Sequence, residues 1–395
     1  MTIDFTKSER STIGIEWELA IVDKDSKKLI PIWQNIRTRV DNEHPDVAPN
    51  FHSELMSNTV EVVTGVHKTV GSAVDELNHL CVVAKDLVES EGGKIFTAGT
   101  HPFDDPLNQQ INSSPYYKKI LSRARIWMHS MLIWGQHIHV GIEDKNKVLP
   151  IWHAMLAECG LLLATSTSSP FWNNTSTGYA SNRSLYFAQL PTAGIGYQFN
   201  EWSEFENCVE GLMNSNSITS FGELWWDIRP AVHYGTLEIR VLDSQTNIYD
   251  IARLTALIQC MVEYFSTLID EGKQDELPKL EGWFVRQNKW RASRYGLNAK
   301  LIVNNDAREQ NARDHLRELL VKLRPIASKL GCSKEIAELY DFANEGMTSA
   351  ARQLEVAKNF MPEVNFNQTI GVPLTETAGK MVTQSLIDEF EISLW

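Results

Sequence analysis

The segment TIGIEWELAI, residues 12–21, alternates without interruption between large apolar side chains and small or acidic ones. Successive side chains of a β-strand point to opposite faces of a sheet, so this period of two predicts a strand with one packed face. The packed face would be formed by five apolar residues: Ile13, Ile15, Trp17, Leu19 and Ile21. The opposite face would carry Glu16 and Glu18 side by side.

Three further segments show a similar alternation, at residues 59–64, 136–142 and 236–241, most weakly in the first. Their apolar faces contain these side chains: Val60 and Val62; Ile138, Val140 and Ile142; Leu237, Ile239 and Val241. Their other faces carry these ionisable groups: Glu61; His137 and His139; Glu238 and Arg240. Strands with one apolar and one polar face are typical of antiparallel sheets, so the four segments predict such a sheet.

Amphipathic helices are predicted between these strands, at residues 70–91 and 250–270, where apolar residues recur at helical spacing. The apolar run 149–164 is predicted to be one buried helix, because it contains His153 and Glu158 and is too short to cross a bilayer. Helices that cover one side of an antiparallel sheet make α+β the expected fold class.

The polar segment 270–278 is expected to be a linker or a long loop. Strands and helices mix before it, whereas residues 306–330 and 333–360 after it show helical periodicity. We therefore expect residues 1–270 to form the antiparallel-sheet domain with its covering helices. Residues 271–395 would form a mostly helical C-terminal region, separate from that domain or packed on it.

Composition narrows the possible partners and the compartment. The 395 residues include 37 Lys and Arg against 50 Asp and Glu, which gives a net charge of −13. Because binding to nucleic acids and to anionic lipids needs a basic surface, we expect neither partner. The five cysteines are far apart and form no C-x-x-C pair, which favours a reducing compartment. The first ten residues, MTIDFTKSER, lack the apolar run of a signal peptide, so the expected location is the cytoplasm.

The polar faces of the four strands together differ from an ordinary solvated surface. Any one of them alone would be compatible with a strand that faces water. Their central positions, however, hold four carboxylates, two imidazoles and one guanidinium, and no lysine. Crowded carboxylates repel one another unless cations neutralise them, and oxygen ligands suit Mg²⁺ or Mn²⁺. Since the guanidinium of Arg240 matches phosphate oxygens, the pattern predicts a metal-dependent phosphoryl-transfer site.

Glu54 is a further candidate for this site. It precedes Glu61 by an odd number of residues, which would place the two on opposite faces of one straight strand. A turn or bulge at Ser57 and Asn58 would bring them together. The sequence contains no P-loop, no dinucleotide-binding glycine motif and no protein-kinase signature, so those scaffolds are excluded.

Several short motifs occur in a fixed order along the chain. They are GIE-x-E at 14–18, Glu54 with EVVT at 61–64, GTHPF at 99–103, GQHIHVG at 135–141, ASNR at 180–183, WWDIRP at 225–230, GTLEIR at 235–240 and KWRASRYG at 289–296. In this combination the sequence resembles the glutamate–cysteine ligase type 2 family, and within it the bacterial carboxylate-amine ligase branch. The resemblance covers roughly residues 11–300.

The resemblance implies a glutamine-synthetase-like fold, in which a curved antiparallel sheet forms a cradle with helices on its outer face. It also implies ATP as a co-substrate and Mg²⁺ or Mn²⁺ as cofactors. Six side chains match the family's metal ligands: Glu16, Glu18, Glu54, Glu61, His139 and Glu238. Arg240 matches the arginine that faces the γ-phosphate, so Arg240 and Glu238 would act at the reacting group. The resemblance assigns no role to His137.

The implied reaction is the ATP-dependent formation of a γ-glutamyl amide. ATP would phosphorylate the γ-carboxylate of glutamate, and an amine, cysteine in the named activity, would then attack the acyl phosphate. The expected partners are therefore small-molecule substrates, and a homo-oligomer is the expected assembly.

Four further basic residues are candidates beside this set. Arg183 is expected to hold a substrate carboxylate, the alternative being a surface-loop arginine. Arg229 would clamp a carboxylate or a phosphate, or merely pair with Asp227. Lys289 and Arg291 would contact the nucleotide phosphates, or form a solvated basic helix face.

Two other functions are compatible with these residues. One is a phosphotransferase that acts on a guanidino or carboxylate compound and releases the phosphorylated product. The other is a catalytically silent protein that binds nucleotides or amino acids, which the presence of every proposed metal ligand disfavours.

Overall fold

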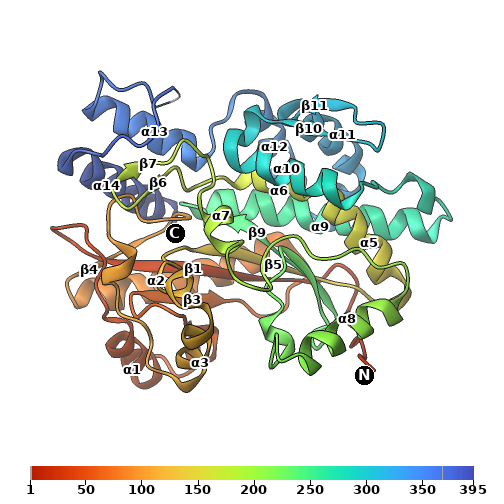
Figure 1. Cartoon of the computed structure of the whole chain (residues 1–395), viewed down its shortest axis with the longest axis horizontal. Helices are drawn as coiled ribbons and strands as arrows, with labels where there is room; N and C mark the ends of the chain where they lie inside the picture. The colour runs from red at the N-terminus through yellow and green to blue at the C-terminus, as the bar shows by residue number, and fades with distance from the viewer. Residues whose placement is uncertain (1, 367) are drawn as a thin grey trace.

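The computed structural model describes residues 2–366 and 368–395, and its central element is an antiparallel sheet of seven strands (Figure 1). Six strands pair in the order β2-β3-β1-β5-β9-β8, and β4 pairs with β1. Their bounds are β1 (Ile13–Asp23), β2 (Phe51–Ser53), β3 (Thr59–Val63), β4 (Gly93–Phe96), β5 (Gly135–Gly141), β8 (Ile228–Ala231) and β9 (Thr236–Asp243). The four strands expected from the alternating segments are thereby confirmed.

Two short hairpins lie outside this sheet. They are formed by β6 (Phe171–Trp172) with β7 (Thr175–Ser176), and by β10 (Lys300–Ile302) with β11 (Glu309–Asn311).

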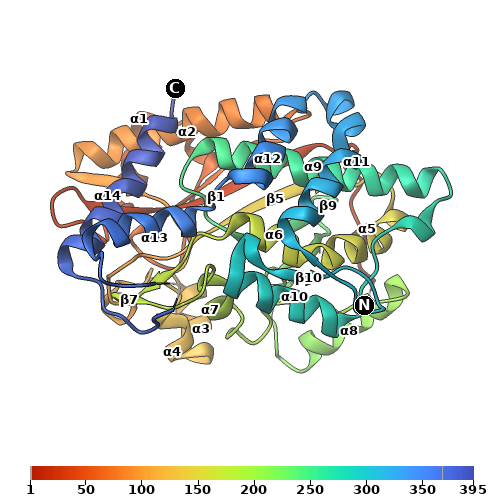
Figure 2. The same cartoon turned by 90° about the horizontal axis from the view of Figure 1, so that it is seen from above.

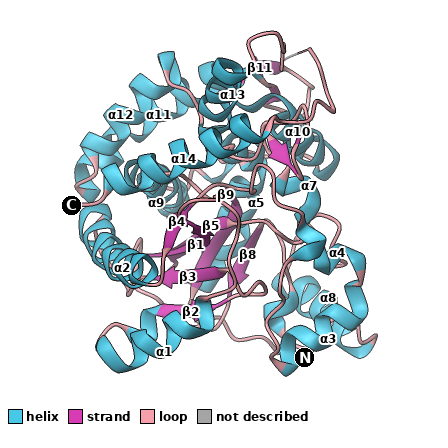
Figure 3. Cartoon of the chain, turned by 90° about the vertical axis from the view of Figure 1, so that its left-hand side faces the viewer, coloured by secondary structure: helices cyan, strands magenta, loops and turns pink. Residues whose placement is uncertain are grey.

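One face of the central sheet is packed against helices. The alternating apolar residues of β1 are all buried, and none of them exposes more than 1% of its surface. The helices α2 (Val70–Ser90) and α9 (Ile248–Asp270) lie along this face (Figures 2 and 3). Each large apolar side chain buried in this way contributes about 1.5–3 kcal/mol to folding. A register slip of one residue would turn that whole set toward the other face, so the packing specifies which side chains the polar face displays.

The prediction that residues 149–164 are buried is confirmed, but the prediction that they form one continuous helix is wrong. The structure has two mostly buried helices there, α5 (Lys145–Ala157) and α6 (Cys159–Ser166), with a bend of 54° between them. Glu158 lies at the break and its carboxylate accepts a hydrogen bond from His315 Nε2 at 2.7 Å. No single helix of the described residues is long and apolar enough to cross a membrane. Helices α5 and α6 are long and apolar enough only when they are counted together, across the bend between them.

The remaining helices flank the sheet or form the C-terminal part. They are α1 (Trp33–Glu43), α3 (Pro115–Ala124), α4 (Ile126–His129), α7 (Arg183–Phe187), α8 (Trp202–Asn214), α10 (Gly282–Tyr295), α11 (Ala312–Leu330), α12 (Ser333–Glu345), α13 (Ser349–Phe360) and α14 (Glu376–Ser393). The segment 270–278 connects α9 to α10 through a short 3₁₀ turn, as expected of a loop. Helices α11 and α12 pack on α9 in the same hydrophobic core, and the domain division at residue 270 stays a prediction.

Helices also flank the polar face of the sheet. There α3, α4 and α7 lie opposite α2 and α9, with the sheet between the two groups (Figure 3). The mixture of an antiparallel sheet and helices confirms the expected α+β class.

Candidate active site

The register of the strands places the ionisable side chains of the polar face in rows across the sheet. Glu18 on β1 stands opposite Glu61 on β3, and Glu16 stands opposite His137 on β5. In the next row His139 on β5 stands opposite Glu238 on β9. Since residues directly opposite each other in an antiparallel pair share a face, these side chains converge.

Glu54 joins this group through a turn. The strands β2 and β3 form an antiparallel pair in which His52 stands opposite Glu61. Glu54 follows His52 by two residues and therefore continues on the same side of the chain, just before the turn at residues 55–58. The predicted turn between Glu54 and Glu61 is thus confirmed.

The converging side chains line one cavity of about 480 Å³. It contains all the predicted metal ligands and three of the predicted arginines: Glu16, Glu18, Glu54, Glu61, His139, Glu238, Arg183, Arg229 and Arg240. It also contains His137, to which the sequence comparison assigned no role.

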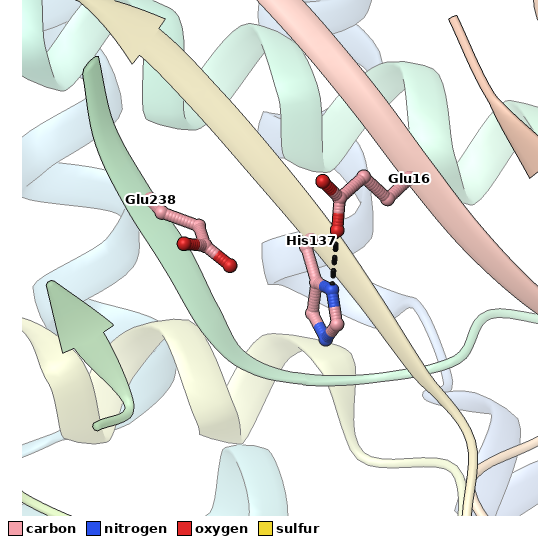
Figure 4. Close-up of side chains that lie close together, drawn as sticks. All are labelled: Glu16, His137 and Glu238. Carbon is pink, nitrogen blue, oxygen red and sulfur yellow. Dashed lines mark hydrogen bonds and ion pairs between the residues drawn. The ribbon is translucent and has the colours of Figure 1, made fainter. Parts of the chain in front are cut away.

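His137 lies at the centre of the acidic cluster (Figure 4). Its Nδ1–H donates to Oε2 of Glu16 at 2.8 Å, and its Nε2 lies 3.7 Å from Oε1 of Glu18. Among the described residues, two sets of ligand atoms lie close enough to share a metal ion, namely Glu16, His137 and Glu238, and Glu18, Glu61 and His137. His137 belongs to both sets. The signal that indicates it is its spacing of two from His139, which puts both imidazoles on one face.

His139 has a different environment from that of His137. Its Nε2–H donates to Oε1 of Glu16 at 3.0 Å, and its Nδ1 lies 2.8 Å from the hydroxyl oxygen of Thr236. Burial opposes protonation, but the negative charges of Glu238 and Glu16 raise the pKa of His139 above its usual value. His139 belongs to neither of the two candidate metal sets among the described residues, and its role as a ligand stays a prediction.

The acidic side of the cavity is short of positive charge. Burial and the neighbouring charge of Glu18 raise the pKa of Glu54 to about 8. Burial and repulsion from Glu16 likewise raise the pKa of Glu61 well above its usual value. Although burial also opposes its ionisation, hydrogen bonds from His137 and His139 keep the pKa of Glu16 low. Divalent cations would remove the repulsion among these oxygens.

Glu238 lies between two arginines at the other side of the cavity. Its Oε2 accepts a hydrogen bond from Arg229 Nε at 2.7 Å, and its Oε1 accepts one from Arg240 Nη1. Burial opposes ionisation, but the two guanidinium groups hold the pKa of Glu238 well below its usual value. Arg229 therefore pairs with Glu238, and the alternative of a pair with Asp227 is wrong.

Arg183 is buried against the sheet, with only 3% of its surface exposed. The alternative of a surface-loop arginine is therefore wrong. The side chain lies over Gly135, where an added Cβ would stand 2.1 Å from Nη2 of Arg183. Its hydrogen bonds to the carbonyl of Arg240 are long, at 3.4 and 3.5 Å, and Oδ1 of Asp243 is 4.0 Å away. Its Nε has no partner among the described residues, so the cation retains free donor capacity.

Lys289 and Arg291 do not line the cavity. Nζ of Lys289 donates to both carboxylate oxygens of buried Asp227, at 2.6 and 2.8 Å. Arg291 pairs with Glu309 at 2.7 Å near the surface. Since both cations are already paired outside the cavity, their predicted contact with nucleotide phosphates gains no support.

The chain is similar in sequence to known proteins. The model of glutamate-cysteine ligase family 2 (GCS2) matches residues 12–370. "Putative glutamate--cysteine ligase 2" of Leifsonia xyli subsp. xyli is 41% identical over 356 residues, which covers 90% of this chain and 93% of that protein. The protein of the same name from Corynebacterium glutamicum (strain R) is 42% identical over 346 residues, covering 88% and 91%.

A solved structure has a similar fold. The glutamate–cysteine ligase of Francisella tularensis, solved in complex with AMP, superposes with a TM-score of 0.62 at 16% identity, and the match covers 99% of this chain and 94% of that one. This likeness confirms the expected fold, an antiparallel sheet with covering helices.

Proposed function

Since the chain belongs to the glutamate–cysteine ligase family 2, we propose that it is an ATP-dependent ligase that joins the γ-carboxylate of glutamate to an amine such as cysteine. One observation carries this proposal. Five carboxylates, three guanidinium groups and the imidazoles of His137 and His139 converge in a single cavity, although they come from segments far apart in the sequence. Anionic and cationic groups in such proximity suit a reaction in which metal ions and arginines share the charge of transferring phosphate.

The donor set fits Mg²⁺ or Mn²⁺. Hard divalent ions prefer carboxylate oxygens, and burial together with repulsion from neighbouring carboxylates raises the pKa values of Glu54 and Glu61. Glu16, Glu18 and Glu61 would hold the ions with His137, and the other predicted ligands would complete their shells. Such ions, when bound, neutralise phosphate oxygens and the charge that develops on them during transfer.

Two arginines would act on the substrates directly. Arg240 is held in place by Glu238, and its Nε is buried without a partner among the described residues, so it retains a donor for the γ-phosphoryl oxygens. Arg183 would bind a substrate carboxylate with its free donors. Arg229 would act indirectly, since its contacts with Glu238 and the carbonyl of Leu224 orient the carboxylate.

The proposed reaction consists of two displacements. First, a γ-carboxylate oxygen of glutamate attacks the γ-phosphorus of ATP, the bond to ADP breaks, and a γ-glutamyl phosphate forms. The amine nitrogen then attacks the acyl carbon, the carbon–oxygen bond to phosphate breaks, and the nitrogen loses a proton. The products are a γ-glutamyl amide, ADP and inorganic phosphate.

The test is a coupled assay for ADP with product identification by mass spectrometry. ADP release is expected to require Mg²⁺ or Mn²⁺, glutamate and an amine together, with one amide formed per ADP. Glu238→Ala should abolish it, whereas Glu355→Gln, at an exposed position on α13, should not change it. A stable phosphorylated product without an amide would instead indicate a phosphotransferase, and nucleotide binding without any turnover would indicate a silent binding protein.

A further inference from the structure

The cavity has an apolar wall that the proposed chemistry of the phosphate does not use. This wall consists of Met56, Ile120, Met128, Met131, Phe187 and Leu190. Five of these side chains are at least nine-tenths buried and pack in one cluster, and Phe187 packs against that cluster. Three segments supply the wall on the polar side of the sheet: the turn before β3, the stretch from α3 through α4 to Met131, and the stretch from the end of α7 to Leu190.

Arg183 lies where the apolar wall meets the acidic face. Its guanidinium carbon stands 5.6 Å from the ring centre of Phe187, one turn further along the same helix. On the other side Arg183 contacts Gly135, whose N–H donates to the carboxylate of Glu18. Burial lowers the pKa of the Arg183 guanidinium, as expected of a cation with few compensating partners. An anionic group of a ligand would supply the missing partner.

The surroundings of Arg183 match the three groups of an α-amino acid, namely its carboxylate, its amine and its side chain. A carboxylate on Arg183 would leave the α-amine directed toward the carboxylates of the sheet and the side chain directed toward the apolar wall. An apolar wall next to a charged group would favour a side chain without charge. Adenine fits this position less well, because the base has no anionic group to pair with Arg183.

We propose that the acceptor amine is an α-amino acid with an extended apolar side chain, which lies against Met128 and Met131 while its carboxylate binds Arg183. This inference rests on the proposed ligase function and specifies its second substrate. Leucine, methionine and phenylalanine belong to the proposed class, whereas the side chain of cysteine is too short to fill the apolar wall, so cysteine would be a poorer substrate. A hydrophobic pocket discriminates by about tenfold or more for each methylene that it buries.

The first experiment measures kcat/KM for a panel of amines at saturating glutamate and ATP. The panel contains glycine, alanine, serine, cysteine, leucine, methionine, phenylalanine, aspartate and lysine. Leucine, methionine or phenylalanine should exceed alanine and cysteine by at least about tenfold. ADP release that is fastest with cysteine, glycine or a charged amine would overturn the inference and leave the ligase function standing. No ADP release with any amine would overturn the ligase function itself.

The second experiment places a charge in the wall. Met131→Asp should lower kcat/KM for leucine at least tenfold, while the KM values of ATP and glutamate change less than twofold. Met381→Asp, on the exposed part of α14, is the matched control and should have no effect. Should Met131→Asp fail to fold, Met131→Ala should shift the preference from leucine toward phenylalanine. A rise in the KM of ATP instead would show that the wall holds the base, and would overturn the inference.

The third experiment separates the carboxylate from the side chain. Arg183→Gln should lower kcat/KM for leucine at least tenfold more than kcat/KM for 3-methylbutan-1-amine, which has the same side chain and no carboxylate. Equal losses for the two amines would contradict the contact between Arg183 and the acceptor carboxylate.

Discussion

His137 donates a hydrogen bond from Nδ1 to Oε2 of Glu16 at 2.8 Å, and this contact joins β5 to β1 at the centre of the acidic face. The bond directs Nε2 of the same ring toward Glu18, which lies 3.7 Å away. The imidazole is thereby oriented by one carboxylate and presented to a second, an arrangement found where histidines bind or position metal ions. In this family member the histidine is thus part of the site.

We expect His137→Gln to weaken metal binding. Loss of a ligand or of the group that orients one typically costs about 10–100-fold in metal affinity or activity. A Mn²⁺ titration followed by calorimetry or electron paramagnetic resonance measures the affinity directly. His79→Gln, at an exposed position on α2, is the control. Equal Mn²⁺ affinity in wild type and His137→Gln would show that His137 only packs in the site.

Metal binding should depend on pH through Glu54 and Glu61. The pKa of Glu54 is raised to about 8, so below that pH an ion must displace its proton in order to bind. Affinity for Mn²⁺ is therefore expected to rise between pH 6.5 and pH 8.5, with proton release in that range. The measurement is calorimetry in buffers of different ionisation enthalpy. The double variant Glu54→Gln/Glu61→Gln should bind more weakly and lose this pH dependence, and an unchanged dependence would contradict the assignment.

The same groups predict the pH dependence of stability in the metal-free protein. A carboxyl group whose folded pKa lies above its unfolded value of 4.5 stabilises the fold while it is protonated. That contribution is present at low pH and is lost as the pH rises from about 4.5 toward about 8. The free energy of unfolding of wild type relative to Glu54→Gln should fall across this window in urea titrations. If the free energy of unfolding of wild type relative to Glu54→Gln rose with pH instead, the predicted direction of the effect would be contradicted.

Gly135→Ala should displace Arg183 without unfolding the protein. The new methyl group would stand 2.1 Å from Nη2, at the far end of a flexible side chain, so the arginine must move while the backbone need not. We expect a KM at least about tenfold higher for the substrate whose carboxylate Arg183 binds, since a charge-assisted contact is worth that much. Gly71→Ala is the control, because among the described residues its added Cβ meets nothing within 4 Å apart from its chain neighbours and the adjacent backbone of α2, and α2 should gain about 0.5–1 kcal/mol of stability. Unchanged kinetics in Gly135→Ala would contradict the role of Arg183.

Arg240→Lys should reduce the rate more than the binding of substrates. Lysine keeps the charge but loses the planar fork, which donates to Glu238 and, in the proposed role, would also donate to a phosphoryl group. The expected loss in kcat is about 10²–10³-fold, with little change in the KM of ATP. Steady-state kinetics with both substrates varied provide the measurement. A large rise in the KM of ATP with unchanged kcat would instead assign Arg240 to ground-state binding.

The sheet and most of its polar face could be predicted from sequence because a strand has a period of two. Once the apolar residues of segment 12–21 are known to be packed, Glu16 and Glu18 can only lie on the other face. Glu54 required a turn, and Ser57 and Asn58 are residue types that form turns. His137 had the same signal as His139, but the family comparison gave it no role, so its position in both metal sets became evident only from the distances.

Features that depend on partners distant in sequence could not be predicted in this way. The break between α5 and α6 lies at Glu158, which pairs with His315 more than 150 residues later. Nothing within residues 149–164 indicates that contact. Likewise, Lys289 belongs with Arg291 to a basic cluster in the sequence, but its buried partner Asp227 lies on another segment and Lys289 does not line the cavity.

The central claim is that carboxylates from separate strands bind divalent ions beside a triphosphate. A crystal soaked with Mn²⁺ and a non-hydrolysable ATP analogue, with anomalous diffraction recorded near the manganese edge, tests it most directly. The account predicts anomalous peaks within bonding distance of Glu16, Glu18, Glu61 or Glu238, in contact with the phosphates. A triphosphate bound elsewhere, or manganese found only outside this cavity, would contradict it.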